Sequence, residues 1–374
     1  MDAELYKPFK LTFFILKKIG MLQDGEQSWI YFVCGYFFHF IVIYVYIFGQ
    51  LTYLINAADL MDFSEGLALT TTFIALSLRS INFFRKINKI KTSVEALNKL
   101  LRKTDHEASI KDRKFIRQEV SFCYKVYLAF LFSGILTLTS GAFVPVINNK
   151  VPYKFWFPFD TNKETSEVGF WIASYILVLH SFPTGILDIS LCMLPVIFMA
   201  FAIGLLRELS ERLKKIKTIE ELVQCVTIHQ EIKLFIKDIH GNFAETIFFQ
   251  GIMSSLTLCT GVFTMSVTEN LTQLIRIITF LIPMLLEIFL PCYFGNELSI
   301  ASSTLTTSIF QSNWIDGDMT FKRALMIFTE CNRKELKITS LGLFDVNIAT
   351  FSSIGRSAYS VFNVLKQSTN RNSY

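Results

Sequence analysis

Long apolar stretches are the feature that most constrains how this chain can fold. About 20 residues of α-helix cover the roughly 30 Å hydrocarbon core of a bilayer. Stretches of about this length lie at about 29–53, 66–84, 122–147, 169–206, 243–267, 271–294 and 338–366. Hydrophobic residues make up 52% of the 374 residues and charged residues only 18%, which is more apolar surface than a soluble domain of this size needs. The sequence therefore predicts a single-domain, all-α polytopic membrane protein with seven transmembrane helices.

The distribution of positive charge predicts the orientation of these helices. Residues 85–119 carry eleven Lys and Arg against five Asp and Glu, whereas the turn before the second span is acidic. Loops rich in Lys and Arg beside membrane spans lie in the cytoplasm. We therefore expect a cytoplasmic N-terminus and, after seven crossings, an extracellular C-terminus. Segments 207–240 and 295–337 are then cytoplasmic as well.

The last span differs from the others in carrying small and polar residues at every turn. They are Ser352, Ser353, Gly355, Ser357, Ser360 and Asn363. A helix that faces only lipid has no need of such a stripe, whereas a helix that lines a water-filled path does. The alternative is close packing of small residues against neighbouring helices. The stripe makes the last span the first candidate for a pore wall.

Motifs of catalysis and metal binding are missing from the sequence. The seven cysteines are scattered without a CxxC pair, and no HExxH, GxSxG or P-loop is present. Among the ionisable residues within predicted spans, His180, Asp188 and Glu287 are candidates for a functional role. Such residues mark functional sites or hydrogen-bonded packing between helices. We expect neither an enzyme, nor a cofactor, nor a bound metal, nor a nucleic-acid partner.

Two motifs near the C-terminus resemble those of the insect odorant receptor family. The first is the segment Pro291-Cys292-Tyr293-Phe294-Gly295-Asn296-Glu297-Leu298, followed by Ser302, Ser303 and Trp314. The second is the ending 350–365, with the pattern Thr-Phe-x-x-Ile, then Tyr-Ser-x-Phe-x-x-Leu. Arg356 stands where the family usually has Lys, and Phe310 where it usually has Tyr. The Thr-Tyr…Gln-Phe ending of the related gustatory receptors is absent.

This resemblance implies an odorant-gated, non-selective cation channel of four subunits in the plasma membrane of a sensory dendrite. Each subunit contributes its seventh helix to a central pore, and the cytoplasmic ends of helices four to seven form the anchor between subunits. Odorant-tuning subunits of the family pair with the co-receptor Orco, which is longer through an insertion between helices four and five. Residues 207–240 show no such insertion, so the chain resembles a tuning subunit.

The resemblance also implies where the channel gate lies. Val364 falls at the hydrophobic gate and Gln367 at the polar constriction outside it, with Ser360, Asn363 and Ser368 on the same face. A ring of apolar side chains closes a pore by dewetting, and a ring of amides replaces part of an ion's hydration shell.

The family's odorant site lies in the outer half of one subunit, between helices two, three, four and six. Helix direction selects the candidates Leu69, Thr72, Phe73 and Leu76; Ser133, Leu136, Thr137 and Ser140; Ile172, Tyr175, Ile176, Leu179 and His180; and Ile277, Phe280 and Pro283. A mostly apolar and aromatic pocket with a few hydroxyls suits a small, neutral volatile.

Two other classes of membrane protein remain as alternatives. A transporter would show an inverted repeat and paired broken helices, which we do not find. A G-protein-coupled receptor also has seven helices, but its N-terminus is extracellular, opposite to the orientation expected here.

Overall fold

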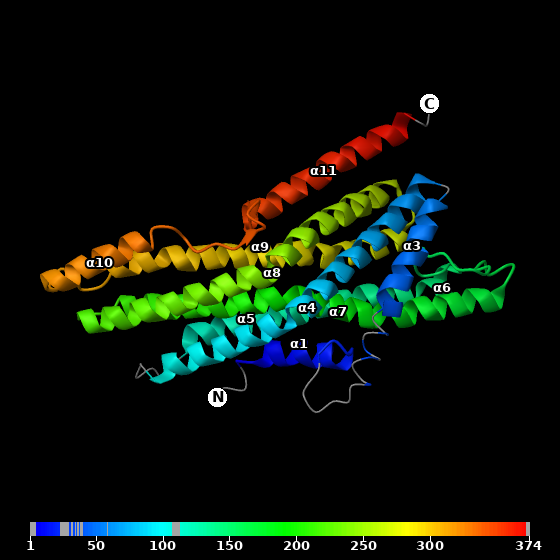
Figure 1. Cartoon of the computed structure of the whole chain (residues 1–374). Coiled ribbons are helices and arrows are strands. Elements are labelled where there is room, and N and C mark those ends of the chain that lie inside the picture. The colour runs from blue at the N-terminus through cyan, green and yellow to red at the C-terminus, as the bar shows by residue number, and fades with distance from the viewer. Residues whose placement is uncertain are drawn as a thin grey trace.

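The computed structural model of this chain is a bundle of long helices (Figure 1). It describes residues 5–22, 30, 33, 35, 37, 40–57, 59–106 and 113–371, without the side chains of residues 40, 42, 104–106, 361 and 364–371. The elements are α1 (Lys7–Lys18), the π-helix η1 (Phe40–Val45), α3 (Tyr46–Ile55), α4 (Leu60–His106), α5 (Lys114–Ala142), α6 (Val144–Asn148), α7 (Glu167–Leu213), α8 (Ile219–Val267), α9 (Leu271–Phe310), α10 (Met319–Cys331), β1 (Thr339–Ser340), β2 (Phe344–Asp345) and α11 (Ile348–Arg371).

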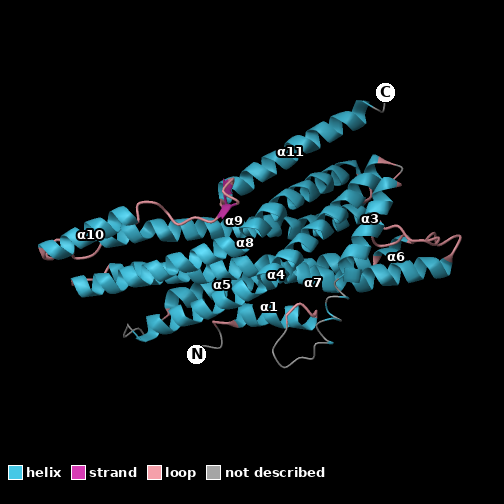
Figure 2. Ribbon diagram, in the orientation of Figure 1, coloured by secondary structure: helices cyan, strands magenta, loops and turns pink. Residues whose placement is uncertain are grey.

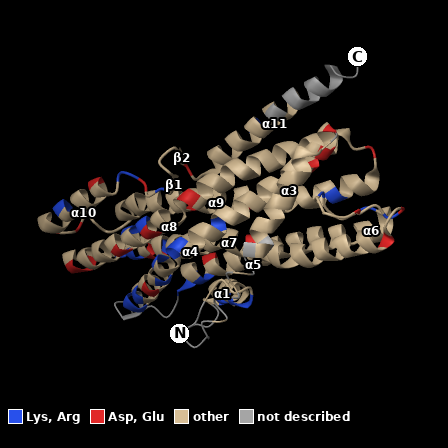
Figure 3. Ribbon diagram, turned by 45° about the vertical axis from the view of Figure 1, so that its right-hand side comes forward, with Lys and Arg blue, Asp and Glu red and all other residues tan. Residues whose placement is uncertain are grey.

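Five of the described helices, α4, α5, α7, α8 and α9, are long and apolar enough to cross a membrane. These correspond to the second to sixth predicted spans. The first predicted span, 29–53, falls partly outside the described residues, and its described end forms η1 and the shorter apolar helix α3. Lys and Arg gather at the end of the bundle formed by α1, the end of α4 and the beginning of α8, and they are sparse along its middle (Figure 3). This distribution is typical of a multi-pass membrane protein.

Several helices extend well beyond the predicted spans. The helix expected at 66–84 runs on to His106, the one expected from 243 begins at Ile219, and the one expected to end at 294 continues to Phe310. Their charged extensions remain amphipathic, and the apolar side chains Leu97 and Leu101 are fully buried there. A capping box between Thr218 and Glu221 starts α8. The segment 207–240 is therefore shared between the end of α7 and the beginning of α8.

The start of the last helix was predicted wrongly. Residues 338–347 do not continue a helix but form a short antiparallel hairpin, in which Ser340 pairs with Phe344 (Figure 2). Leu341 and Gly342 have φ angles of 50° and 72°, a conformation that ends helical structure. Helix α11 begins only at Ile348, where the Asn347 side chain accepts a hydrogen bond from the Thr350 amide at 2.9 Å.

Helix α7 forms the centre of the bundle. It packs against α5, α8 and α9, and its residues from Leu187 to Leu206 are buried throughout. A helix that is apolar on all sides belongs in the interior of a bundle rather than at its edge. Helix α11, in contrast, diverges from the bundle and contacts it mainly through α8 and α9 at its N-terminal end (Figure 1).

Gly295 holds the hairpin against α9. A Cβ at this position would lie 2.2 Å from the backbone oxygen of Val346, so a side chain does not fit without displacing the hairpin. Gly295 lies inside α9, where alanine has the better helix propensity. The glycine is therefore required by this contact and not by its own helix.

We predict that Gly295→Ala lowers stability because it pushes the hairpin off α9, at a cost of about 1–3 kcal/mol. Thermal unfolding of the detergent-purified protein measures the effect. Gly241→Ala is the matched control, because a Cβ there meets nothing within 4 Å. Equal melting temperatures for both variants would show that the hairpin contact does not contribute to stability.

Candidate functional site

An inner cavity of about 110 Å³ lies between α4, α5, α7 and α9. Tyr46 of α3 and Tyr153 of the loop before α7 complete its wall. The lining residues are Tyr46, Leu69, Thr72, Phe73, Leu76, Phe130, Gly134, Thr137, Leu138, Tyr153, Ser181, Thr184, Gly185, Asp188, Ile189, Phe280, Pro283 and Met284. The wall is apolar and aromatic with a few oxygen atoms, which is the usual composition of a small-molecule site.

Seven of the candidates from the sequence line this cavity. They are Leu69, Thr72, Phe73, Leu76, Thr137, Phe280 and Pro283. Ile277 lines a second cavity next to it. The helical register assumed for α4 and α9 therefore places these side chains where we expected them, although their contact with an odorant stays a prediction.

The register assumed for α7 was wrong. Ile172, Tyr175, Ile176 and Leu179 do not line either cavity, and Tyr175 and Leu179 are 69% and 61% exposed on the outer face of the bundle. The buried face of this part of α7 combines Phe170 and Leu177 with the small polar residues Ser174, Ser181 and Thr184. In a bilayer, large apolar side chains are free to face lipid, so hydrophobicity did not identify the inner face.

Three other candidates of α5 also lie away from the inner cavity. Leu136 is exposed, and the Ser133 hydroxyl donates to the backbone oxygen of Phe130 at 2.8 Å. Ser140 donates to the backbone oxygen of Thr137 at 2.7 Å and borders a wider hollow near the loop before α7 instead. Only Thr137 of the four candidates on this helix reaches the cavity.

His180 lies just behind the cavity wall. Its ring stacks on Tyr46 with 4.0 Å between the ring centroids and an angle of 5°, and Tyr46 lies 4.3 Å from the ring of Phe73. Phe155 covers the other side of Tyr46 at 4.8 Å. His180 thus positions an aromatic wall rather than facing the cavity. Tyr46 and Tyr153 were not among the candidates predicted from the sequence, because neither lies on the four helices expected to form the site.

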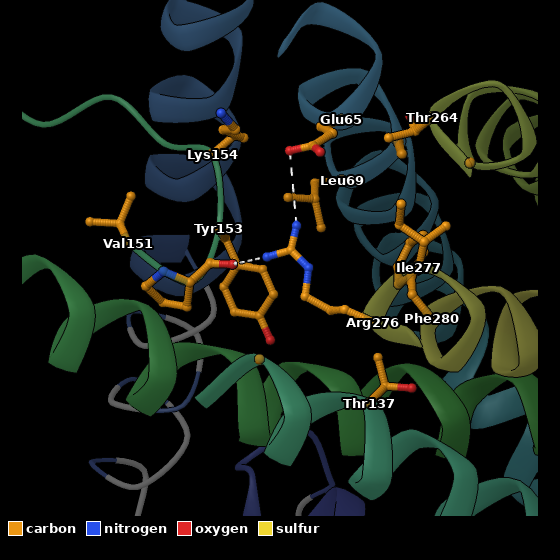
Figure 4. A pocket seen from close by; sticks show the side chains of 14 residues that line it. Glu65, Leu69, Thr137, Val151, Tyr153, Lys154, Thr264, Arg276, Ile277 and Phe280 are labelled. Carbon is orange, nitrogen blue, oxygen red and sulfur yellow. Dashed lines mark hydrogen bonds and ion pairs between the residues drawn. The ribbon is translucent and has the colours of Figure 1, made fainter. Parts of the chain in front are cut away.

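A second, outer cavity of about 100 Å³ adjoins the first and shares Leu69, Thr137, Tyr153 and Phe280 with it. Arg276 crosses this outer cavity (Figure 4). Its guanidinium donates to the backbone oxygen of Pro152 at 3.2 Å and lies 3.9 Å from the Glu65 carboxylate. These contacts tie α9 to α4 and to the loop before α7.

A wide vestibule of about 960 Å³ opens outside this cavity and shares Glu65, Val151, Lys154 and Arg276 with it. Lys154 donates to Asp62 at 2.6 Å. Burial opposes the charge of Lys154, but the hydrogen bond to Asp62 and the nearby acidic groups outweigh it and raise the pKa of Lys154 above its usual value. The outer cavity thus lies between the vestibule, at the end of the bundle, and the inner cavity.

A buried ion cluster lies at the inner end of this series. Arg79 of α4 pairs with Asp188 of α7 at 2.9 Å and with Glu287 of α9, and its side chain is only 2% exposed. The Gln250 amide of α8 donates to the backbone oxygen of Glu287 at 2.6 Å. The cluster therefore joins four helices, and it gives Asp188 and Glu287 a partner within the bundle.

The expected gate lies on α11. Ser360 is exposed and Asn363 is half-buried in this single chain. The side chains of Val364, Gln367 and Ser368 lie outside the described part of the structure. The exposed residues Ser352, Ser353 and Ser357 belong to the first half of the helix.

Comparison with known proteins agrees with this arrangement. A family model described as 7tm Odorant receptor matches residues 59–359. Odorant receptor 33b from Drosophila melanogaster is 25% identical over 81% of this chain and 82% of its own length. Odorant receptor Or1 from Anopheles gambiae is 21% identical over 96% of this chain and 94% of its own length. The solved structure of olfactory receptor OR5 from Machilis hrabei in complex with eugenol matches with a TM-score of 0.82, at 16% identity over 97% of this chain and 98% of that one.

We predict that Arg79→Met destabilises the protein by about 3–5 kcal/mol, because it leaves two buried carboxylates without their cation. The melting temperature of the purified protein measures this loss. The triple variant Arg79→Met, Asp188→Asn, Glu287→Gln removes all three charges and should recover most of it. A melting temperature for Arg79→Met equal to that of the native protein would mean that the cluster does not hold the helices together.

Proposed function

This chain belongs to the insect odorant receptor family, and from that premise we propose that it is an odorant-gated subunit of a non-selective cation channel. In this proposal it assembles with the co-receptor Orco into a tetramer in the plasma membrane. The N-terminus and the Lys- and Arg-rich end of the bundle lie in the cytoplasm, and α11 ends outside.

The inner cavity is the observation that carries this proposal. It is enclosed by α4, α5, α7 and α9, and its wall combines aromatic rings with isolated oxygen atoms. Such a site fits a small, neutral, partly aromatic molecule. OR5 from Machilis hrabei, which shares the fold, was solved with eugenol, a molecule of that kind.

Helix α11 supports the proposed role in a pore. In the single chain it stands away from the bundle, with an exposed face that contains Ser352, Ser353, Ser357, Tyr359 and Ser360 (Figure 1). A helix with a polar, exposed face in a membrane protein requires water or other protein chains around it. Four such helices around an axis satisfy this requirement, with Val364 at the gate and Gln367 at the constriction.

The extended ends of α8, α9 and α10 support the proposed contacts between subunits. Leu234, Phe310, Met326 and Ile327 are large apolar side chains that are each more than 60% exposed there. These helices lie at the end of the bundle where charged residues gather, so lipid does not cover them (Figure 3). Neighbouring subunits in an anchor domain would cover this surface.

Recording currents from cells that express this chain with Orco, Orco alone, and this chain alone tests the function directly. We expect some members of a panel of volatiles to open a cation current only in the co-expressing cells. Responses that coincide with those of Orco alone, at normal surface expression, would exclude an odorant-tuning role.

We predict that Phe73→Ala weakens the odorant response about tenfold, because a buried aromatic contact of the cavity is lost. The concentration for half-maximal current measures the change, and the maximal current should persist. Tyr175→Ala is the matched control on the outer face of α7. Equal shifts for both variants, or none for Phe73→Ala, would place the odorant elsewhere.

We predict that Val364→Asn, co-expressed with Orco, raises the current without odorant and alters the permeability ratios of cations. A polar ring wets a constriction that apolar side chains keep dry. Ser352→Asn, at an exposed position about three turns earlier on α11, is the control. If Val364→Asn leaves both quantities at their native values at normal expression, Val364 is not part of the gate.

A further inference from the structure

Helix α1 leaves one face uncovered on the outside of the bundle. The side chains of Lys10, Phe14 and Lys18 are exposed on this face, and their spacing of four residues places them in one row along the helix. From this row we infer a further binding site, a docking surface for the headgroups of anionic phospholipids in the leaflet that borders the basic end of the bundle. The inference goes beyond the proposed channel function and does not depend on it.

The opposite face of α1 fixes the helix on the bundle. Phe9 is 2% exposed and packs on Phe198 and Phe201 of α7, with 4.9 and 5.4 Å between the ring centroids. The Tyr6 hydroxyl, just before α1, donates to the Asn98 side chain of α4 at 2.6 Å. Because these contacts hold the inner face, the outer row points away from the protein and is presented to its surroundings.

The charge of α1 is of one sign. Its 12 residues include four lysines and neither Asp nor Glu. The Phe14 ring is 58% exposed between the two lysines of the row, and the Lys18 ammonium lies 5.8 Å from the centroid of that ring. Lys and Arg also gather at this end of the bundle as a whole (Figure 3). A partner that carries both a phosphate and an apolar chain matches this row, with the phosphate on the ammonium groups and the chain on the ring.

The depth of α1 along the bundle favours a lipid over a soluble partner. The Thr12 hydroxyl lies 3.4 Å from the Tyr127 hydroxyl of α5, which donates to Ser190 of α7 at 3.1 Å. Tyr127 comes five residues after the start of the third predicted span, a distance of about 8 Å along a helix. A basic amphipathic helix at a membrane surface buries its apolar side chains to a depth of about 5–10 Å, while the ammonium groups reach the headgroups.

Anionic lipids suit the row better than zwitterionic ones. A zwitterionic headgroup carries its own cation beside the phosphate, whereas a phosphatidylserine headgroup keeps a net negative charge that lysines can compensate. In the orientation proposed above, this leaflet faces the cytoplasm, and that leaflet is where anionic lipids are concentrated. Each lysine near an anionic membrane surface strengthens the attraction about fivefold, so Lys10 and Lys18 together contribute about thirtyfold.

Thermal unfolding of the detergent-purified full chain, titrated with phosphatidylserine or with phosphatidylcholine of the same acyl chains, tests this site without any channel recording. We expect phosphatidylserine to raise the melting temperature at concentrations where phosphatidylcholine does not. The double variant Lys10→Gln, Lys18→Gln should need about thirtyfold more phosphatidylserine for half-maximal stabilisation. Its melting temperature without lipid should equal the native value, because both side chains are exposed.

Two further variants separate this site from a general effect of charge. Lys10→Arg, Lys18→Arg keeps the charge of the row and should keep the native response. Lys215→Gln, Lys217→Gln removes two exposed lysines from the turn between α7 and α8 and should also keep it. Glycerophosphoserine, the same headgroup without acyl chains, should not stabilise the protein.

Several results would overturn the inference. These are equal stabilisation by the two lipids, an unchanged phosphatidylserine response in the Lys10 and Lys18 glutamine variant, equal weakening in the two glutamine variants, or full stabilisation by glycerophosphoserine. Loss of subunit assembly in the Lys10 and Lys18 glutamine variant, with an unchanged response to phosphatidylserine, would assign this face of α1 to a neighbouring subunit instead.

Discussion

In the hydrocarbon core of a bilayer there is no water to satisfy a polar group, and this structure is organised around that constraint. Many serine and threonine side chains of the spans donate to carbonyls of their own helices, as Thr70 does to Gly66 at 2.8 Å. Where two helices meet, polar groups pair across the contact, as Thr71 of α4 and Thr257 of α8 do at 2.8 Å. The ion cluster of Arg79, Asp188 and Glu287 is the strongest case, because one guanidinium serves two carboxylates from different helices.

The same constraint gives the inner cavity its chemical character. The four serine and threonine hydroxyls of its wall are tolerated among apolar side chains because each donates to a backbone oxygen. The lone pairs of these four hydroxyls remain on a surface that is otherwise mostly apolar and aromatic. The hydrogen bonds that these hydroxyls make within the bundle therefore decide which of their polar atoms face the cavity.

The ion cluster also connects the inner cavity with the base of α11. Asp188 lines the inner cavity, whereas Glu287 lines a small cavity at the foot of α11 together with Thr350 and Ile354. Gly295, one turn of α9 further on from Pro291, receives the hairpin that precedes α11. The wall of the cavity and the base of the last helix are therefore parts of one continuously packed structure.

Composition and short motifs were sufficient to predict the class of protein, the approximate position of most spans and the family. These features depend on local composition and on short motifs, and the bilayer requires about 20 apolar residues wherever a helix crosses. Candidates on α4 and α9, such as Phe73 and Phe280, also proved to line the cavity. On those helices the chosen residues are the ones that other helices cover.

Three features depend on how the helices pack: the face of α7 that is turned inward, the full length of the helices, and the residue at which the last helix begins. In water, large apolar residues mark the inner face of a helix, but in lipid both faces are apolar, so Tyr175 and Leu179 misled the assignment. The small polar residues Ser181 and Thr184 lie on the inner face, because they need partners within the protein. The roles of Arg79, Tyr46 and Tyr153 arise from residues far apart in the chain that meet only after folding, and no pattern of local spacing contains that information.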